Sequence, residues 1–196
     1  MKLLPYGPRA VLAELDSLAE VMATATAWRA AGLPGAIEIV PAARTVLVVH
    51  DGTLDTARLV AAEPGVALFD AQSVTIDVDY DGSDLVTVAK ASGLSVDAVV
   101  ELHSGAVYTV AFCGFMPGFA YLVGLPPALH LPRRVTPRTR VPACSVAIAA
   151  EFAGVYPRES PGGWHLLGTT DAVLWNDDAT PPALLTPGTT VRFRQR

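Results

Sequence analysis

Proline is distributed unevenly along this 196-residue chain, and the distribution limits which folds are possible. Eleven of the 16 prolines lie after Val107. Proline interrupts helices because it lacks an amide hydrogen and its ring clashes with the preceding turn. The same part of the chain contains short β-prone runs at 107–113, 145–149, 165–168, 172–175 and 190–193. We therefore predict a β-barrel or sandwich with long ordered loops there.

The N-terminal part alternates helical and strand-like patterns. Residues 18–31 repeat apolar side chains at helical spacing, and residues 54–62 form a second helical pattern. With β-rich runs between and after the helices and an opening strand, the order is βαββαβ, the ferredoxin-like arrangement. We therefore predict an α+β ferredoxin-like domain over residues 1–80, with strands at 11–15, 36–40, 45–50 and 74–78.

Residues 81–104 differ from both of these regions, because two short helical patterns lie close together there. The segments 84–91 and 96–103 are separated by the sequence Ser92-Gly93-Leu94-Ser95. We predict that they form a helical connector between the N-terminal domain and an all-β domain over residues 105–196.

Charge is divided unequally between the two halves of the chain. Residues 1–104 contain 14 acidic and 6 basic side chains, whereas residues 105–196 contain 5 acidic side chains and 8 arginines. The net charge of −5 argues against general binding to nucleic acid or to an anionic membrane. Arginine suits bidentate contacts with carboxylate or phosphate, so an anion site is expected in the C-terminal half.

The uncharged stretch from Val110 to Pro132 is long enough to span a bilayer, but prolines and glycines interrupt it. We interpret it as buried or partner-facing loop and strand. The N-terminus lacks the apolar core of a signal peptide. Cys113 and Cys144 fit a reduced pair, and the four histidines show no metal-ligand spacing. These features favour a cytoplasmic protein with no metal site and no membrane association.

The segment 114–122, Gly-Phe-Met-Pro-Gly-Phe-Ala-Tyr-Leu, is the most informative one. The chain has no phosphate-binding loop and no familiar hydrolase or metalloprotease signature, so chemistry must be sought in less standard motifs. The aromatic side chains of this segment can form either a turn that plugs the core or the wall of a pocket. The pocket or interface candidates are Phe115, Pro117, Gly118, Phe119 and Tyr121.

The loop that follows is both stiff and basic. Arg133 and Arg138 each come directly after a proline, and no acidic residue occurs from Tyr108 to Ala150. Neither arginine therefore has a carboxylate partner nearby in the sequence. Such a loop suits an anion clamp, although solvated surface arginines produce the same pattern.

A second turn-rich segment lies near Trp164. The pair Gly162-Gly163 allows the backbone to approach a ligand closely, and Ser160 and Trp164 add a hydroxyl and an indole on either side. A sharp turn without any ligand uses the same residue types.

These motifs occur in one fixed order along the chain. The segment 114–122 is followed by Pro132-Arg133, Pro137-Arg138, Ser145-Val146, Gly154-Val155-Tyr156-Pro157 and Ser160-Pro161-Gly162-Gly163-Trp164. In this order they resemble the family that comprises the PxpB component of 5-oxoprolinase, the inhibitor KipI and allophanate hydrolase subunit 1. The resemblance extends over nearly the full length of the chain.

The resemblance implies a ferredoxin-like domain followed by a cyclophilin-like β-barrel. It also implies a subunit of an ATP-dependent hydrolase that converts 5-oxoproline, ATP and water to glutamate, together with a subunit-2-type (PxpC-like) partner and a PxpA-like protein. ATP with Mg²⁺ would act at the level of the complex, with none held tightly by this chain. The implied substrate or anion-binding residues are Arg133, Arg138, Ser145, Tyr156, Ser160, Gly162, Gly163 and Trp164; no catalytic residue is assigned.

One region departs from the usual family sequence. Family members usually have glycine at the positions of Cys144, Ala147 and Ala150, and Gln-Thr in place of Phe152-Ala153. The lost polar groups leave the substrate open between 5-oxoproline, allophanate and another amide. Two other functions also remain: a KipI-like inhibitor of a histidine kinase, whose interface would suit an apolar Phe152-Ala153, and a component of an allophanate or urea carboxyltransferase-type assembly.

Overall fold

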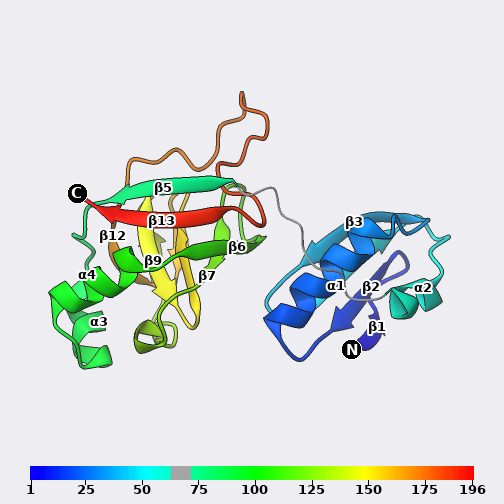
Figure 1. The fold of residues 1–196 in the computed structure, drawn as a ribbon, viewed down its shortest axis with the longest axis horizontal. Helices are drawn as coiled ribbons and strands as arrows, with labels where there is room; N and C mark the ends of the chain where they lie inside the picture. The colour runs from blue at the N-terminus through cyan, green and yellow to red at the C-terminus, as the bar shows by residue number, and fades with distance from the viewer. Residues whose placement is uncertain (63–71) are drawn as a thin grey trace. The chain divides into compact units, whose positions relative to one another are not determined.

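The chain forms two compact units, Met1–Leu68 and Phe69–Arg196. The computed structural model describes residues 1–62 and 72–196, and Figure 1 shows their helices and strands. Each unit has a hydrophobic core of its own.

Within residues 1–62, the N-terminal unit forms a four-stranded antiparallel sheet and two helices. The strand order is β1-β2-β4-β3. Helix α1 begins after Ser17, whose side chain accepts a hydrogen bond from the amide of Glu20, a common helix start. The elements are β1 (Lys2–Pro5), β2 (Ala10–Glu14), α1 (Leu18–Ala30), β3 (Ala36–Pro41), β4 (Thr45–His50) and α2 (Thr56–Ala61).

The predicted βαββαβ order is wrong in its last strand. The run at 74–78 forms β5 (Ser73–Val78), which pairs in parallel with β13 (Thr190–Gln195) in the second unit. Its side chains Ile76 and Val78 are buried in the larger core, so burial and pairing both place β5 outside the N-terminal sheet. The edge position beside β2 is occupied by β1, a short proline-containing strand that the sequence patterns did not reveal.

The second unit contains a nearly closed, barrel-like sheet of seven strands, which confirms the predicted β-rich C-terminal half. The strand order is β12-β9-β10-β7-β6-β13-β5. Paired backbone hydrogen bonds of 2.9 and 2.8 Å between Asp79 and Thr169 join the chain after β5 to β12 and thereby form a closing seam. The remaining strands are β6 (Tyr108–Cys113), β7 (Ala120–Val123), β8 (Arg138–Val141), β9 (Ser145–Ala149), β10 (Phe152–Val155), β11 (Ser160–Gly162) and β12 (His165–Thr169), and η1 (Pro127–Leu129) is a short 3₁₀ helix.

The helices predicted as a connector are part of the second unit. Helix α3 (Leu85–Ser92) and helix α4 (Val96–Gly105) bury Val88 and Val99 in the same core as the barrel strands. Apolar faces on both helices drive this packing, because each would otherwise be exposed to water. The segment 81–104 therefore does not separate two domains.

The uncharged stretch from Val110 to Pro132 supplies much of the barrel interior. Val110 on β6 and Leu122 on β7 are completely buried. Its apolar character thus serves the core of this chain, which agrees with the buried alternative of our interpretation. Among the described residues, no helix is long and apolar enough to cross a membrane.

Backbone conformation differs among Cys144, Ala147 and Ala150, the three positions at which the family resemblance implies glycine. Cys144 and Ala150 flank β9 with positive φ angles of 62° and 50°, whereas Ala147 lies inside the strand and is completely buried. The left-handed region costs a non-glycine residue about 1–2 kcal/mol. The sequence departure thus leaves strain at two of the three positions.

We expect Ala150→Gly to stabilise the protein by up to about 1 kcal/mol, because relief of the left-handed strain exceeds the added chain entropy of glycine. The matched change Ala147→Gly should destabilise it by about 1 kcal/mol or more, since a buried methyl group is lost from a strand. Urea denaturation of both variants measures the difference. Shifts of the same sign at the two positions would contradict this explanation.

Candidate functional site

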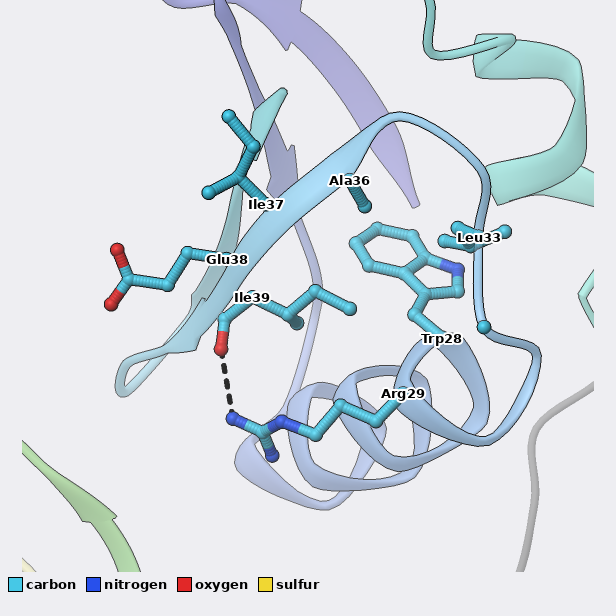
Figure 2. A pocket seen from close by; sticks show the side chains of 8 residues that line it. Trp28, Arg29, Leu33, Ala36, Ile37, Glu38 and Ile39 are labelled. Carbon is cyan, nitrogen blue, oxygen red and sulfur yellow. Dashed lines mark hydrogen bonds between the residues drawn. The ribbon is translucent and has the colours of Figure 1, made fainter. Parts of the chain in front are cut away.

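A hollow of about 590 Å³ in the N-terminal unit lies between α1 and β3. Figure 2 shows Arg29 reaching from α1 to the backbone carbonyl of Ile39, a hydrogen bond of 2.8 Å. The Trp28 indole donates to the carbonyl of Leu59 at 2.9 Å. These polar groups thus form hydrogen bonds within the unit itself. In addition, β3 is an edge strand, and proteins commonly cover the unpaired edge of a sheet with a neighbouring segment. We therefore interpret this hollow as structural.

A second hollow, in the C-terminal unit, brings together most of the residues predicted from the sequence. We call it the aromatic pocket. Its volume is about 300 Å³, and it is lined by Phe115, Phe119, Tyr121, Arg133, Arg134, Pro137, Tyr156, Pro161, Gly162, Gly163 and Trp164. Apolar rings with a few convergent polar groups are typical of a small-molecule site.

One wall of the aromatic pocket comes from the turn between β6 and β7. Phe119 is almost completely buried, and its ring packs edge-on against four other aromatic rings at centroid distances of 5.1 to 5.4 Å. Phe115 has a φ angle of 71° and is 59% exposed. The turn thus fixes a rigid aromatic interior and holds one strained phenylalanine at the surface.

The opposite wall comes from Tyr156, from β11 and from the residues that join β11 to β12. A side chain at Gly162 would overlap the hydroxyl of Tyr156, so glycine allows the ring and the backbone to meet. Trp164 is 4% exposed and packs against both Phe119 and Tyr121.

The loop that carries Arg133 is fastened to this second wall on both sides of that residue. The amide of Arg134 donates to the carbonyl of Gly163 at 2.8 Å, and Nε2 of His165 lies 2.9 Å from the carbonyl oxygen of Pro132. Arg133 itself is exposed, and within residues 1–62 and 72–196 it forms no ion pair. The aromatic pocket therefore has one guanidinium available for an anion.

Two phenols face the same environment. Burial raises the pKa of Tyr121 and of Tyr156, and the nearby charge of Arg133 opposes the rise in both. Both side chains therefore stay neutral near pH 7 and keep a hydroxyl hydrogen to donate. The aromatic pocket combines flat apolar walls, neutral hydroxyl donors and one cation, which together suit a small planar molecule that carries a negative charge.

The expectation that Arg138 is available for an anion is wrong, because a distant part of the sequence supplies its carboxylate partner. Its guanidinium donates to both oxygens of Asp84 at 2.8 Å, and it also donates to Ser83. Asp84 lies 54 residues earlier in the chain, so no local pattern could have revealed the pair. Arg138 does not line the aromatic pocket.

The other predicted residues divide into two groups. The predicted residues that line the aromatic pocket are Phe115, Phe119, Tyr121, Arg133, Tyr156, Gly162, Gly163 and Trp164. Those that do not line it are Pro117, Gly118, Arg138, Ser145 and Ser160. Ser145 is buried and donates to the carbonyl of Pro142, whereas the buried hydroxyl of Ser160 has no hydrogen-bond partner in the described structure. The sequence analysis missed Arg134, Pro137 and Pro161, which directly adjoin residues that it selected.

The unusual pair Phe152-Ala153 lies behind the aromatic pocket. Both side chains are buried on β10. The Phe152 ring packs edge-on against Tyr121 and Phe112, with centroids 5.5 and 5.8 Å away. Phe152 therefore supports a pocket residue, whereas Ala153 packs in the core of the unit, so neither side chain is exposed as an interface.

A protein-family model described as "Carboxyltransferase domain, subdomain C and D" matches residues 1–185. The chain belongs to this family. Two relatives, each named as the B subunit of 5-oxoprolinase, confirm the resemblance found in the sequence. The protein from Escherichia coli O157:H7 is 38% identical, over 95% of this chain and 92% of its own length. The protein from Haemophilus influenzae is 37% identical, over 98% and 97%.

Two solved structures are similar to this chain in fold. The protein TTHA0988 is 37% identical with a TM-score of 0.80, and the match covers 96% of this chain but only 40% of TTHA0988. The urea carboxylase of Kluyveromyces lactis has a TM-score of 0.76 at 20% identity, over 99% of this chain and 21% of the enzyme. At that identity the second likeness concerns the fold alone.

Proposed function

We propose that this chain is a non-autonomous subunit of an ATP-dependent 5-oxoprolinase-type hydrolase, which opens the lactam of 5-oxoproline to glutamate. The observation that carries the proposal is the aromatic pocket with its free Arg133, in a chain whose relatives are named as the B subunit of 5-oxoprolinase. The partners would be a subunit-2-type (PxpC-like) protein and a PxpA-like protein.

The chemistry of 5-oxoproline supports this assignment. The molecule is a small flat lactam with one carboxylate. Arg133 can pair with the carboxylate in a charge-assisted contact, and aromatic faces can cover the ring. The neutral phenols of Tyr121 and Tyr156 can donate hydrogen bonds to a polarised oxygen. These are binding and stabilising roles, since the pocket lining contains no nucleophile paired with a base.

The aromatic pocket does not fit ATP with Mg²⁺. A triphosphate needs several cations or backbone amides, and its metal ion prefers carboxylate oxygens. The lining has no carboxylate, and of its two arginines Arg134 is already paired with Asp84. We therefore assign nucleotide binding to the complex and derive no step of it from this pocket.

The two rival functions have less support. The regulator hypothesis favoured Phe152-Ala153 as an interface, but both side chains are buried. For a urea carboxyltransferase-type component, the support is the description of the matching family model and a likeness in fold to the Kluyveromyces lactis enzyme at 20% identity. Neither alternative accounts for the aromatic pocket as directly as a small anionic substrate does.

The purified chain alone should show no turnover of 5-oxoproline, because its pocket can bind but has no group to attack the lactam. The measurement is the release of glutamate from 5-oxoproline in the presence of ATP and Mg²⁺, followed by chromatography. A control with heat-denatured chain sets the background rate. Steady glutamate release by the chain without partners would overturn its assignment as a non-autonomous subunit.

A further inference from the structure

Asp84 is a buried carboxylate that sits at the meeting point of three segments. It is 2% exposed. Its Oδ1 accepts hydrogen bonds from Arg134 at 2.6 Å and Arg138 at 2.8 Å, and its Oδ2 accepts from Arg138 at 2.8 Å and the amide of Leu166 at 2.9 Å. A carboxylate offers about four acceptor sites, so this group is saturated.

The position of Asp84 in the chain makes this arrangement unusual. It is the N-cap residue of α3, where an aspartate normally bonds the amides of the first helical turn, yet its side chain makes no such bond. Its backbone is fastened to β12 instead, because the amides of Gly82 and Asp84 each donate to a β12 carbonyl at 3.1 Å. The carboxylate is thus held rigidly and directed at the arginine loop.

Of the two arginines that Asp84 binds, Arg134 lies on the loop that forms one side of the aromatic pocket, and Arg138 begins β8 at the end of that loop. Arg134 and Pro137 line the pocket. Arg133 directly precedes Arg134, which is the first of the two arginines that contact Asp84. Burial raises the pKa of Asp84, but the hydrogen bonds from Arg138 and Leu166 and the charges of both arginines outweigh it, so the pKa lies below its ordinary value. Asp84 therefore stays ionised near pH 7 and keeps both arginines engaged.

We propose that Asp84 is a positioning residue for the aromatic pocket: by engaging Arg134 and Arg138, it fixes the loop so that Arg133 is presented to the substrate as the free cation. The proposal rests on the proposed function, because it takes the anion of the substrate to be the partner of Arg133. Asp84 itself does not line the pocket and acts only through the loop.

Positioning and simple electrostatics predict opposite effects for Asp84→Asn. Removal of a negative charge near an anion site should lower KM for an anionic substrate. Loss of the loop geometry should raise KM instead, and we expect a rise of about 10- to 100-fold with a smaller change in kcat. Mere loss of folded protein would reduce the apparent kcat and leave KM unchanged.

The matched control is Asp77→Asn. Asp77 on β5 also holds an arginine by two hydrogen bonds, to Arg194 at 2.6 and 2.8 Å, but this pair is exposed and away from the pocket lining. Its KM should stay within about 2-fold of wild type. Asp84→Glu, which keeps the charge but lengthens the side chain, should raise KM by less than Asp84→Asn does.

A second readout makes the result independent of the substrate. Hydrogen exchange in the isolated chain should become at least 10-fold faster at the amide of Arg134 in Asp84→Asn, and should stay unchanged in Asp77→Asn. Kinetics would be measured on the full complex with 5-oxoproline. If the wild-type complex does not act on 5-oxoproline, the proposed function fails and the exchange data decide the positioning role. An unchanged or lower KM, or unchanged exchange at Arg134, would overturn the proposal.

Discussion

Replacing Arg133 with alanine is expected to lower kcat/KM for 5-oxoproline in the assembled enzyme by about 10- to 150-fold. The side chain is exposed at the aromatic pocket and has no ion-pair partner among the described residues. A charge-assisted contact with a carboxylate contributes about 1.5–3 kcal/mol, which corresponds to this range of rates. The measurement is 5-oxoproline-dependent ATP hydrolysis by the full complex.

Two further variants test whether the shape of the guanidinium matters beyond its charge, and whether the effect is specific to this position. Arg133→Lys should recover only part of the loss, because lysine keeps the charge but not the planar fork. Arg140→Ala removes another exposed arginine, one that pairs with Glu159 and does not line the pocket, and should change kcat/KM less than about 2-fold. Equal kinetics for Arg133→Ala and wild type would exclude Arg133 from the site.

Substituting Gly168 with alanine is expected to destabilise the C-terminal unit by roughly 3 kcal/mol or more. A side chain at this position would overlap the backbone carbonyl of Asp79 and press against Val78. Asp79 and Thr169 make the two hydrogen bonds of the closing seam, so the backbone cannot move apart without losing them. Overpacking costs about 1–3 kcal/mol, and each lost hydrogen bond adds about 1 kcal/mol.

Gly105→Ala is the matched control for this prediction. Gly105 is the last residue of α4, and a side chain there would meet no atom within 4 Å. Its stability should stay within about 1 kcal/mol of wild type. Urea denaturation followed by tryptophan fluorescence compares the two variants. Equal midpoints for Gly168→Ala and Gly105→Ala would show that the seam does not hold the barrel closed.

Local patterns predicted the strands that have clear boundaries. The runs at 45–50 and 145–149 form β4 and β9 over the same residues, because β-branched or small apolar side chains end there at turn signals. The strand β10 was missed, since its four residues are all buried and include a glycine, which removes the alternation that marks a half-buried strand. The pairing of β5 with β13 joins residues more than 100 positions apart, so only the folded structure reveals it.

The candidate site was predictable where aromatic rings and glycines lie close together in the sequence. Phe119 and Trp164 were selected on their motifs, and both line the aromatic pocket. Arg138 was selected on the absence of nearby acids, a rule that fails when the partner comes from a distant segment. Asp84 gave no sign of its contacts, since an aspartate before a helix normally suggests a cap.

The most direct test of the proposed function is an omission series with purified components. This chain, a subunit-2-type partner and a PxpA-like protein would be mixed with ATP, Mg²⁺ and 5-oxoproline, and ADP and glutamate release would be measured with each protein left out in turn. We predict 5-oxoproline-dependent release of both products in the complete mixture and none when this chain is absent. The same rate without this chain, or no 5-oxoproline-dependent release with all three proteins, would contradict its role as a hydrolase subunit.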